Sequence, residues 1–201
     1  KTVHLTGFEI SPYWNEQIKT YSFDTDVRIQ INAPSAEPYL SSKPTRLILY
    51  TLPNGNSIEQ TVGKKLKTED DWHFNIQHIG AQTRKLREVL TDENIIVAYL
   101  EATPKSWPSY GGRHKDTPQI FQTIVQSVID QLPKRPEVIV LSSHSGGGSF
   151  LFNFMNSSDS IPSWLNRMSF LDSVYNFSTS STYRHDEKFI TWLKSNPNHY
   201  L

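Results

Sequence analysis

Four short apolar runs, spread from the first quarter of the chain to its last, constrain the fold more than any other feature of the sequence. Each run is hydrophobic on both faces, which is typical of a strand buried between two layers. Amphipathic stretches with a helical period separate the runs. Buried strands that alternate with amphipathic helices predict an α/β fold with a mostly parallel sheet and helices on both faces. The four runs are Leu47–Leu52, Asn94–Leu100, Val138–Leu141 and Met168–Leu171.

The segments around these runs predict the helices and the edge of the sheet. Apolar residues between Ile120 and Leu132 form one stripe, with Thr117 as the expected N-cap and Pro118 in the first helical position. Before the first run, Val3–Ile10 and Val27–Ile31 are expected to form antiparallel edge strands. Further helices are expected at Ile79–Leu90, Ser149–Met155 and Lys188–Ser195.

The length is enough for one domain and barely enough for two, and the composition excludes several classes of function. The 201 residues, 23.1 kDa in mass, suffice for a single hydrophobic core. Lys plus Arg number 20 and Asp plus Glu number 20, so the chain lacks the basic field of a nucleic-acid-binding protein. The absence of cysteine excludes a disulfide scaffold, a thiolate zinc site and a cysteine nucleophile.

No apolar run has the length of a membrane span. A start at Lys1 rather than Met is compatible with export, to the periplasm or outside the cell.

One segment joins a buried strand, a glycine-rich turn and an apolar helix. The strand at Val138–Leu141 continues through Ser143 to Ser145, and Gly146–Gly148 follow before the helix. A serine on such a tight turn projects its hydroxyl above the sheet, and small residues on either side let strand and helix pass closely. The N–H of Gly146 would then face the substrate and stabilise an oxyanion. This pattern predicts a nucleophilic serine.

The alternative interpretation is a glycine-rich helix start that serves packing or binds an anion. A phosphate-binding loop of the P-loop type requires a lysine next to the last glycine, and no lysine lies between Arg135 and Arg167. The strand–turn–helix context therefore favours the nucleophile.

The serine turn and the order of elements around it resemble the α/β-hydrolase family. The resemblance implies a three-layer sandwich and a serine hydrolase that cleaves an ester, less readily an amide, through an acyl-enzyme on Ser145. It implies a small-molecule or carbohydrate-linked ester as substrate, and neither a cofactor nor a metal. In this family the second oxyanion N–H comes from the loop after the third strand, which here is Leu52–Asn56 with Asn54 or Gly55 as candidates.

A serine nucleophile needs a base and an acid that orients the base. In the family the acid follows the serine in the chain, and Asp172 does so at the end of the next buried run. Some family members take their acid from this strand, although more use the following one. The alternative role for Asp172 is to cap a helix or brace a loop.

No histidine of the chain matches the family's position for the base, which is a loop after the last strand. His185 follows Asp172 in the right order but is expected near a helix start, and His199 is expected in a turn. His144 precedes the serine, and its side chain is expected to point away from the catalytic face. The other candidates to line a pocket are His73, His78 and His114.

Three explanations for the missing histidine remain open. Residues 1–201 lack the C-terminal part of a single hydrolase domain, which a missing segment or a second chain would supply; or the base comes from an unusual position; or the protein is a hydrolase-like binding module without catalysis. The first is preferred, because a sheet ending at Met168–Leu171 would expose a buried type of edge.

Two further clusters have simple alternatives. Trp107, Pro108, Tyr110 and His114 form either a stacking platform for a sugar or aromatic acyl group, or ordinary loop packing, which is favoured. The acids around residues 70–73 are expected to form a solvated turn rather than a metal site.

Overall fold

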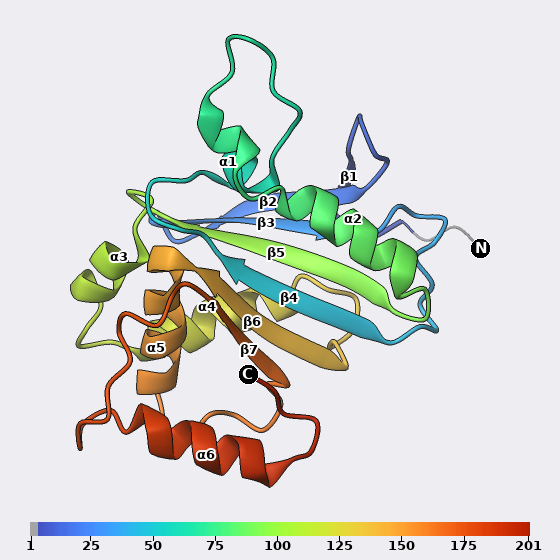
Figure 1. The fold of residues 1–201 in the computed structure, drawn as a ribbon. Coiled ribbons are helices and arrows are strands. Elements are labelled where there is room, and N and C mark those ends of the chain that lie inside the picture. The colour runs from blue at the N-terminus through green and yellow to red at the C-terminus, as the bar shows by residue number, and fades with distance from the viewer. Residues whose placement is uncertain (1–3) are drawn as a thin grey trace.

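A computed structural model describes residues 4–201, and a seven-stranded mixed sheet runs through these residues (Figure 1). The strands lie in the order β1-β2-β3-β5-β4-β6-β7. The elements are β1 (Glu9–Ile10), β2 (Gln17–Phe23), β3 (Val27–Ala33), β4 (Thr45–Thr51), α1 (Ile58–Val62), the 3-10 helix η1 (Trp72–Asn75), α2 (Ile79–Val89), β5 (Asn94–Ala102), α3 (Trp107–Arg113), α4 (Gln119–Ile129), β6 (Val138–His144), the 3-10 helix η2 (Ser145–Gly147), α5 (Gly148–Asn156), β7 (Arg167–Leu171) and α6 (His185–Ser195).

The sheet has a parallel half and an antiparallel half. The strands β5, β4, β6 and β7 pair in parallel, whereas β1, β2 and β3 pair antiparallel and join the rest through β3 and β5. The predicted fold class is therefore confirmed: a mostly parallel core with antiparallel strands towards the N-terminal edge. All four apolar runs lie within or at the ends of β4, β5, β6 and β7.

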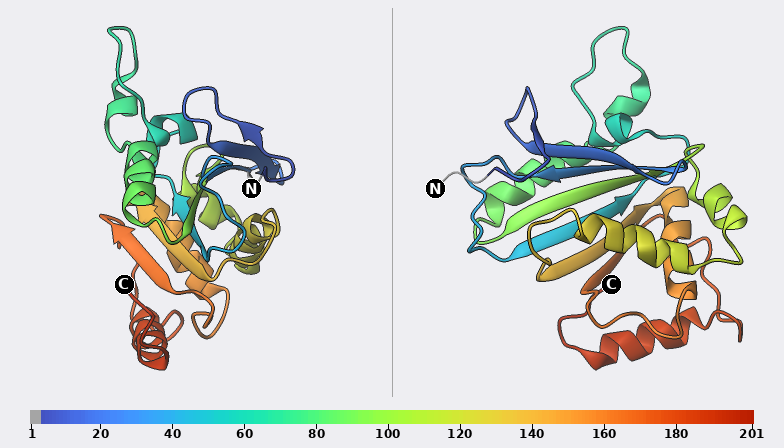
Figure 2. Two further views of the ribbon diagram at one scale, coloured as in Figure 1. Left: turned by 90° about the vertical axis from the view of Figure 1, so that its right-hand side faces the viewer. Right: turned by 180° about the vertical axis from the view of Figure 1, so that it is seen from behind.

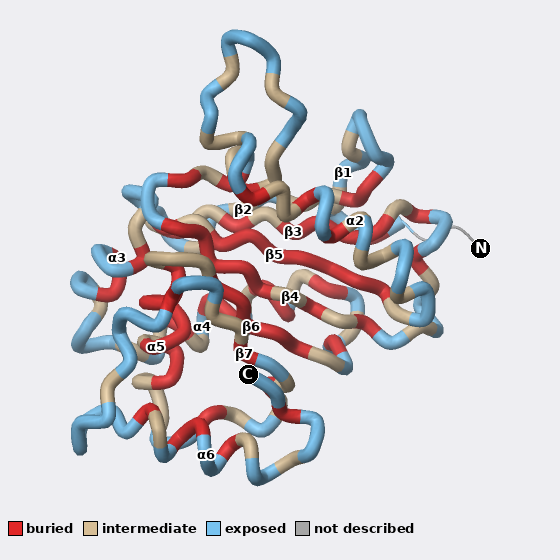
Figure 3. Tube along the Cα trace, viewed as in Figure 1, coloured by how far each residue is buried: buried red, intermediate tan, exposed pale blue. Residues whose placement is uncertain are grey.

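Helices cover the parallel half on both faces, and the alternation of side chains along β5 shows why. Ile96, Ala98 and Leu100 belong to the large core that also contains the apolar side chains of α4 and α5. Val97 and Tyr99 point to the opposite face and form a smaller core, against which Ile79 of α2 packs. Figure 2 shows α2 and α4 on opposite sides of the sheet, and Figure 3 shows the buried strands between them. The three-layer sandwich follows from this two-sided burial.

One expectation for the N-terminal strands was wrong, and one strand was not predicted. Of the predicted strand Val3–Ile10, only Glu9–Ile10 pairs as β1, and Val3 lies outside the described residues. The strand β2 was not predicted, because its side chains alternate between half-buried and exposed and carry no clear apolar period. The edge pair consists of β2 and β3, joined in register from Phe23–Val27 to Gln17–Ala33.

The helix boundaries differ in three places. The helix α4 begins at Gln119, and the Thr117 hydroxyl donates to the carbonyl of His114 instead of accepting from a helical N–H. The predicted loop before Gln77 contains α1 and η1, and the predicted loop after β5 contains α3. The last helix begins at His185, three residues before its predicted start. No helix of the described residues is long and apolar enough to cross a membrane.

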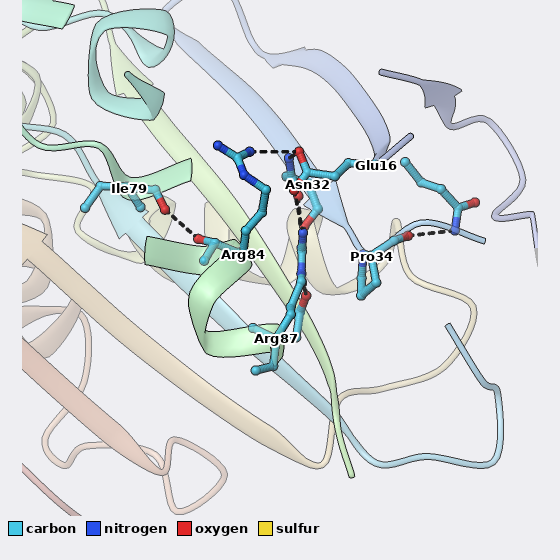
Figure 4. Close-up of polar contacts among 9 residues, drawn as sticks. Glu16, Asn32, Pro34, Ile79, Arg84 and Arg87 are labelled. Atoms are coloured by element: carbon cyan, nitrogen blue, oxygen red, sulfur yellow. Dashed lines mark hydrogen bonds and ion pairs between the residues drawn. The ribbon is translucent and has the colours of Figure 1, made fainter. Parts of the chain in front are cut away.

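A buried charge network fastens α2 to the antiparallel half of the sheet (Figure 4). The Glu16 carboxylate is almost fully buried and accepts from Arg87 Nη1 at 2.8 Å and from Asn32 Nδ2 at 3.1 Å. Arg87 also donates to the carbonyls of Asn32 and Ile95. Arg84 reaches the same carboxylate at 3.4 Å and stacks on the Trp14 ring. Every charge in this network has a partner, as a buried ion pair requires.

Replacing Arg87 with methionine should lower the free energy of unfolding by about 3–5 kcal/mol, because Glu16 would stay buried without its main partner. Arg84→Met is the matched control on the same helix. It removes only the longer contact and should cost about 1 kcal/mol or less. Urea unfolding measures both variants, and equal losses would contradict the assignment of Arg87 as the principal partner of Glu16.

Candidate active site

Ser145 occupies a strained turn between β6 and α5. Its φ is +50°, a left-handed conformation that is costly for a residue with a side chain. The strand β6 ends at His144, one turn of 3-10 helix covers Ser145–Gly147, and α5 starts at Gly148. The serine is half-buried, so the turn holds its side chain at the carboxyl edge of the sheet and leaves it accessible.

The three glycines after Ser145 each face a different neighbour at close range. A Cβ on Gly146 would overlap the side-chain amide of Asn54. A Cβ on Gly147 would overlap the backbone carbonyl of Thr51, and one on Gly148 the backbone carbonyl of Ser173. The Thr51 hydroxyl also donates to Gly147 O at 2.9 Å. The turn therefore lies in close contact with the ends of the strands on either side of it, and a side chain at any of the three glycine positions would collide with them.

Asp172 lies beside Ser145 through the register of the sheet. The last pair between β6 and β7 is His144 with Leu171, so Ser145 and Asp172 are the next residues of two neighbouring parallel strands. Asp172 is exposed and has a φ of +45°. Its carboxylate lies beside the Tyr175 hydroxyl and raises the pKa of that group.

The loop after β4 brings Asn54 to the same edge. The N–H of Gly55 donates to Lys105 O at 2.9 Å, which leaves it occupied. The N–H of Asn54 has no acceptor among the described residues, and the Asn54 side chain lies over Gly146. Of the two residues predicted for the second oxyanion donor, only Asn54 therefore has an unengaged amide.

The two histidines that follow Asp172 in the chain are held by structural contacts. His185 is buried: its Nδ1 accepts from Ser178 N at 3.0 Å and its Nε2 lies 2.8 Å from Asn156 Oδ1. Burial lowers the pKa of His185 to about 4, so this ring stays neutral near pH 7. His199 is buried against Trp192, whose carbonyl its Nδ1 contacts at 2.7 Å. Neither ring is free to accept a proton from Ser145.

The remaining predicted histidines are also spread out. His73 pairs with Asp71 at 2.6 Å on η1, in the excursion that rises from α1 away from the end of β6 (Figure 1). His78 lies 2.8 Å from Asn75 Oδ1, and the His114 ring packs at a tilt against Tyr110 of α3. The Nδ1 of His144 is buried without a hydrogen-bond partner. Within residues 4–201 no histidine nitrogen forms a hydrogen bond with Ser145 Oγ.

The proposed aromatic platform is not formed. Trp107 and Tyr110 are buried in the large core, and the Trp107 indole donates to Leu100 O at 3.2 Å. These two rings pack as the simpler interpretation predicted. In residues 4–201 no group of three or more histidine or acidic side chains could hold a metal ion.

Sequence reasoning missed the side chains that support the site. Thr51, Ser173 and Tyr175 contact the glycine turn or Asp172, yet nothing in a single sequence distinguishes them from other polar residues at strand ends.

Several solved structures with a similar backbone are esterases. Esterase 2 of Thermogutta terrifontis matches with 16% identity over 92% of this chain and 63% of its own, at a TM-score of 0.43. The feruloyl esterase module of Clostridium thermocellum matches with 10% identity over 97% of this chain and 69% of its own, at a TM-score of 0.48. Acylaminoacyl peptidase of Pyrococcus horikoshii matches with 13% identity over 82% of this chain and 23% of its own, at a TM-score of 0.39.

These matches concern the backbone only. The chain spans 54–63% of the length of the first four esterases. Because the TM-scores are below 0.5, no residue role and no substrate is carried over from these proteins. No protein-family model matches the chain, and no curated protein sequence matches it. Its own strand order and its serine turn give it an α/β-hydrolase-like fold.

Substituting alanine for Gly148 should destabilise the protein by about 1–3 kcal/mol or more, because the new methyl group meets a fixed backbone carbonyl. Gly112→Ala is the control: Gly112 lies in α3 with nothing within 4 Å of a built Cβ, so alanine should be neutral or slightly stabilising. Thermal unfolding compares them, and equal stability would show that the turn is not crowded.

Ser145→Gly should be more stable than Ser145→Ala by about 1 kcal/mol, because glycine relieves the left-handed backbone and alanine does not. Both variants lack the hydroxyl, so the difference isolates backbone strain. Urea unfolding measures it, and alanine as the more stable variant would contradict a strained turn.

Proposed function

We propose that this chain carries the nucleophile, acid and oxyanion donors of a serine hydrolase that cleaves a carboxylic ester. The observation that carries the proposal is Ser145 at a φ of +50° on a wedged glycine turn, one strand away from Asp172 in the register of the sheet. A serine with only a packing role has no reason to occupy a strained conformation at the carboxyl edge of a parallel sheet.

The reaction follows from these positions. Ser145 Oγ gives its proton to the base as it attacks the ester carbonyl and forms a tetrahedral oxyanion, which accepts hydrogen bonds from the N–H groups of Gly146 and Asn54. As this intermediate collapses, the base returns the proton to the leaving oxygen, so the alcohol departs and an acyl group stays on Ser145. Water, deprotonated by the same base, then attacks the acyl group and releases the carboxylic acid and free Ser145. An ester is favoured over an amide, because an alcohol leaves the tetrahedral intermediate more readily than an amine does and depends less on proton donation by the base.

The base in this proposal is a histidine outside residues 1–201, oriented by Asp172. It lies on a segment, from the same polypeptide or a second chain, that pairs with the outer edge of β7. The outer edge of β7 supports this placement, because chain pairing already begins there. Tyr200 forms a parallel bridge with Arg167, and its N–H donates to Asn166 O at 3.0 Å. The end of β7, the loop after it, α6 and the last two residues also carry exposed apolar side chains: Leu171, Val174, Tyr175, Phe177, Ile190, Tyr200 and Leu201.

The substrate in this proposal is a small-molecule or carbohydrate-linked ester. The formal net charge of zero favours a neutral substrate over one drawn in by a strong field.

A fluorophosphonate probe tests the proposal, because it labels only a serine with an activated hydroxyl. The full-length protein should be labelled, peptide mapping should place the label on Ser145, and Ser145→Ala should abolish it. Ser109→Ala, at an exposed position of α3, is the control and should be labelled like the parent. Absence of labelling in the folded protein would favour the binding module without catalysis.

A further inference from the structure

Ser143 occupies the position of the first glycine in the hydrolase pattern, and its side chain forms hydrogen bonds there. The residue is fully buried. Its Oγ lies 2.7 Å from Ser173 Oγ and donates to Ser169 O at 3.2 Å. A hydroxyl has one proton, so Ser173 must donate to Ser143 while Ser143 donates to the strand β7. This directed pair joins the end of β6 to the residue next to Asp172.

Ser173 is the single buried residue between positions 171 and 177. Its backbone carbonyl presses against Gly148, and its hydroxyl bonds to Ser143. These two contacts lie on either side of the Ser145 turn, at two residues before it and three residues after it. The exposed segment that carries Asp172 is thus fixed to the nucleophile turn through one buried serine.

Asp172 needs such a fixed point. The ladder between β6 and β7 ends at Leu171, and Asp172 then turns into the left-handed region. Leu171 and Val174 are exposed, and the first ring contacts of this segment come at Phe177, which packs against Phe152 and Phe189. Without the bond to Ser143, the position of the carboxylate relative to Ser145 would rest on the pairing of His144 with Leu171 and on the backbone contact between Ser173 and Gly148.

We infer that Ser143 and Ser173 are positioning residues, whose hydroxyl pair holds Asp172 at the distance from Ser145 that the base requires. This inference rests on the proposed function, because it gives the pair a catalytic consequence. It goes beyond that function in assigning a role to the serine that replaces a glycine. Neither serine touches the substrate or the reacting atoms.

The test measures hydrolysis of p-nitrophenyl acetate by the full-length protein in Ser143→Ala, Ser173→Ala and the double variant. Each single variant should lower kcat about 10- to 100-fold with KM within about twofold, because displacement of an orienting group by about 1 Å costs this much. The double variant should be no worse than the singles, since both remove the same bond. Ser142→Ala is the control, because it removes a neighbouring buried hydroxyl of β6 that forms no side-chain hydrogen bond within residues 4–201, and it should leave kcat unchanged.

The pH profile separates positioning from loss of folding. A carboxylate near a histidine raises the histidine pKa, so a displaced Asp172 should move the acid limb of kcat/KM to lower pH by about one unit. A variant that is merely less stable keeps the limb of the parent. Ser173→Cys, which keeps the volume and forms a weaker hydrogen bond, should have an intermediate kcat and provides a variant that folds if the alanine variants do not.

Hydrogen exchange distinguishes failure of this inference from failure of the proposed function. Amides of residues 171–177 should exchange faster in Ser143→Ala and Ser173→Ala but not in Ser142→Ala, whether or not the protein is catalytic. Labelling of Ser145 with unchanged kcat in both serine variants would overturn the positioning role alone. Absence of labelling would overturn the proposed function. Unchanged exchange would show that the hydroxyl pair does not hold the segment.

Discussion

Crowding at the carboxyl end of β6 is the constraint on which the rest of the molecule depends. The strand lies between β4 and β7, and the chain must turn into α5 without leaving the gap between them. Backbone carbonyls of Thr51 and Ser173 close this gap from both sides. The turn can be made only with glycine and with one residue in a left-handed conformation, and that residue is Ser145. Both neighbouring strands therefore hold the left-handed conformation of Ser145 in place.

The parallel half of the fold could be predicted from the sequence because a strand buried on both faces appears as an almost uninterrupted run of apolar residues. The run Leu47–Leu52 has no polar face, and the same holds for most of β5, which is buried along almost its entire length. The strands of the antiparallel half contain no such apolar runs. Only one of its strands, β3, alternates clearly, whereas β2 mixes half-buried and exposed side chains. The short helix α3 was missed since its buried Trp107 and Tyr110 resemble an aromatic loop when read without tertiary contacts.

The site could be predicted in part, and the division has a physical cause. Ser145 and Gly146 could be proposed because strand, turn and helix follow one another directly in the chain. Asp172 could be proposed because the end of a buried strand must reach the same edge of a parallel sheet. The contacts that fix these residues join segments about thirty positions apart, as between Ser143 and Ser173. Such pairs depend on register, which a single sequence does not encode in any visible pattern.

The placement of β5 has a consequence for how the chain reaches its native state on the ribosome. The hairpin of β2 and β3 is complete once residue 33 has left the exit tunnel, and β4 follows soon after. Yet β5, which inserts between β3 and β4, is synthesised only at residues 94–102. Until then the nascent hairpin and β4 each present an unpaired inner edge, with nothing to join them. The two halves of the sheet therefore cannot unite before β5 has been synthesised, and until then their unpaired edges are open to wrong pairing.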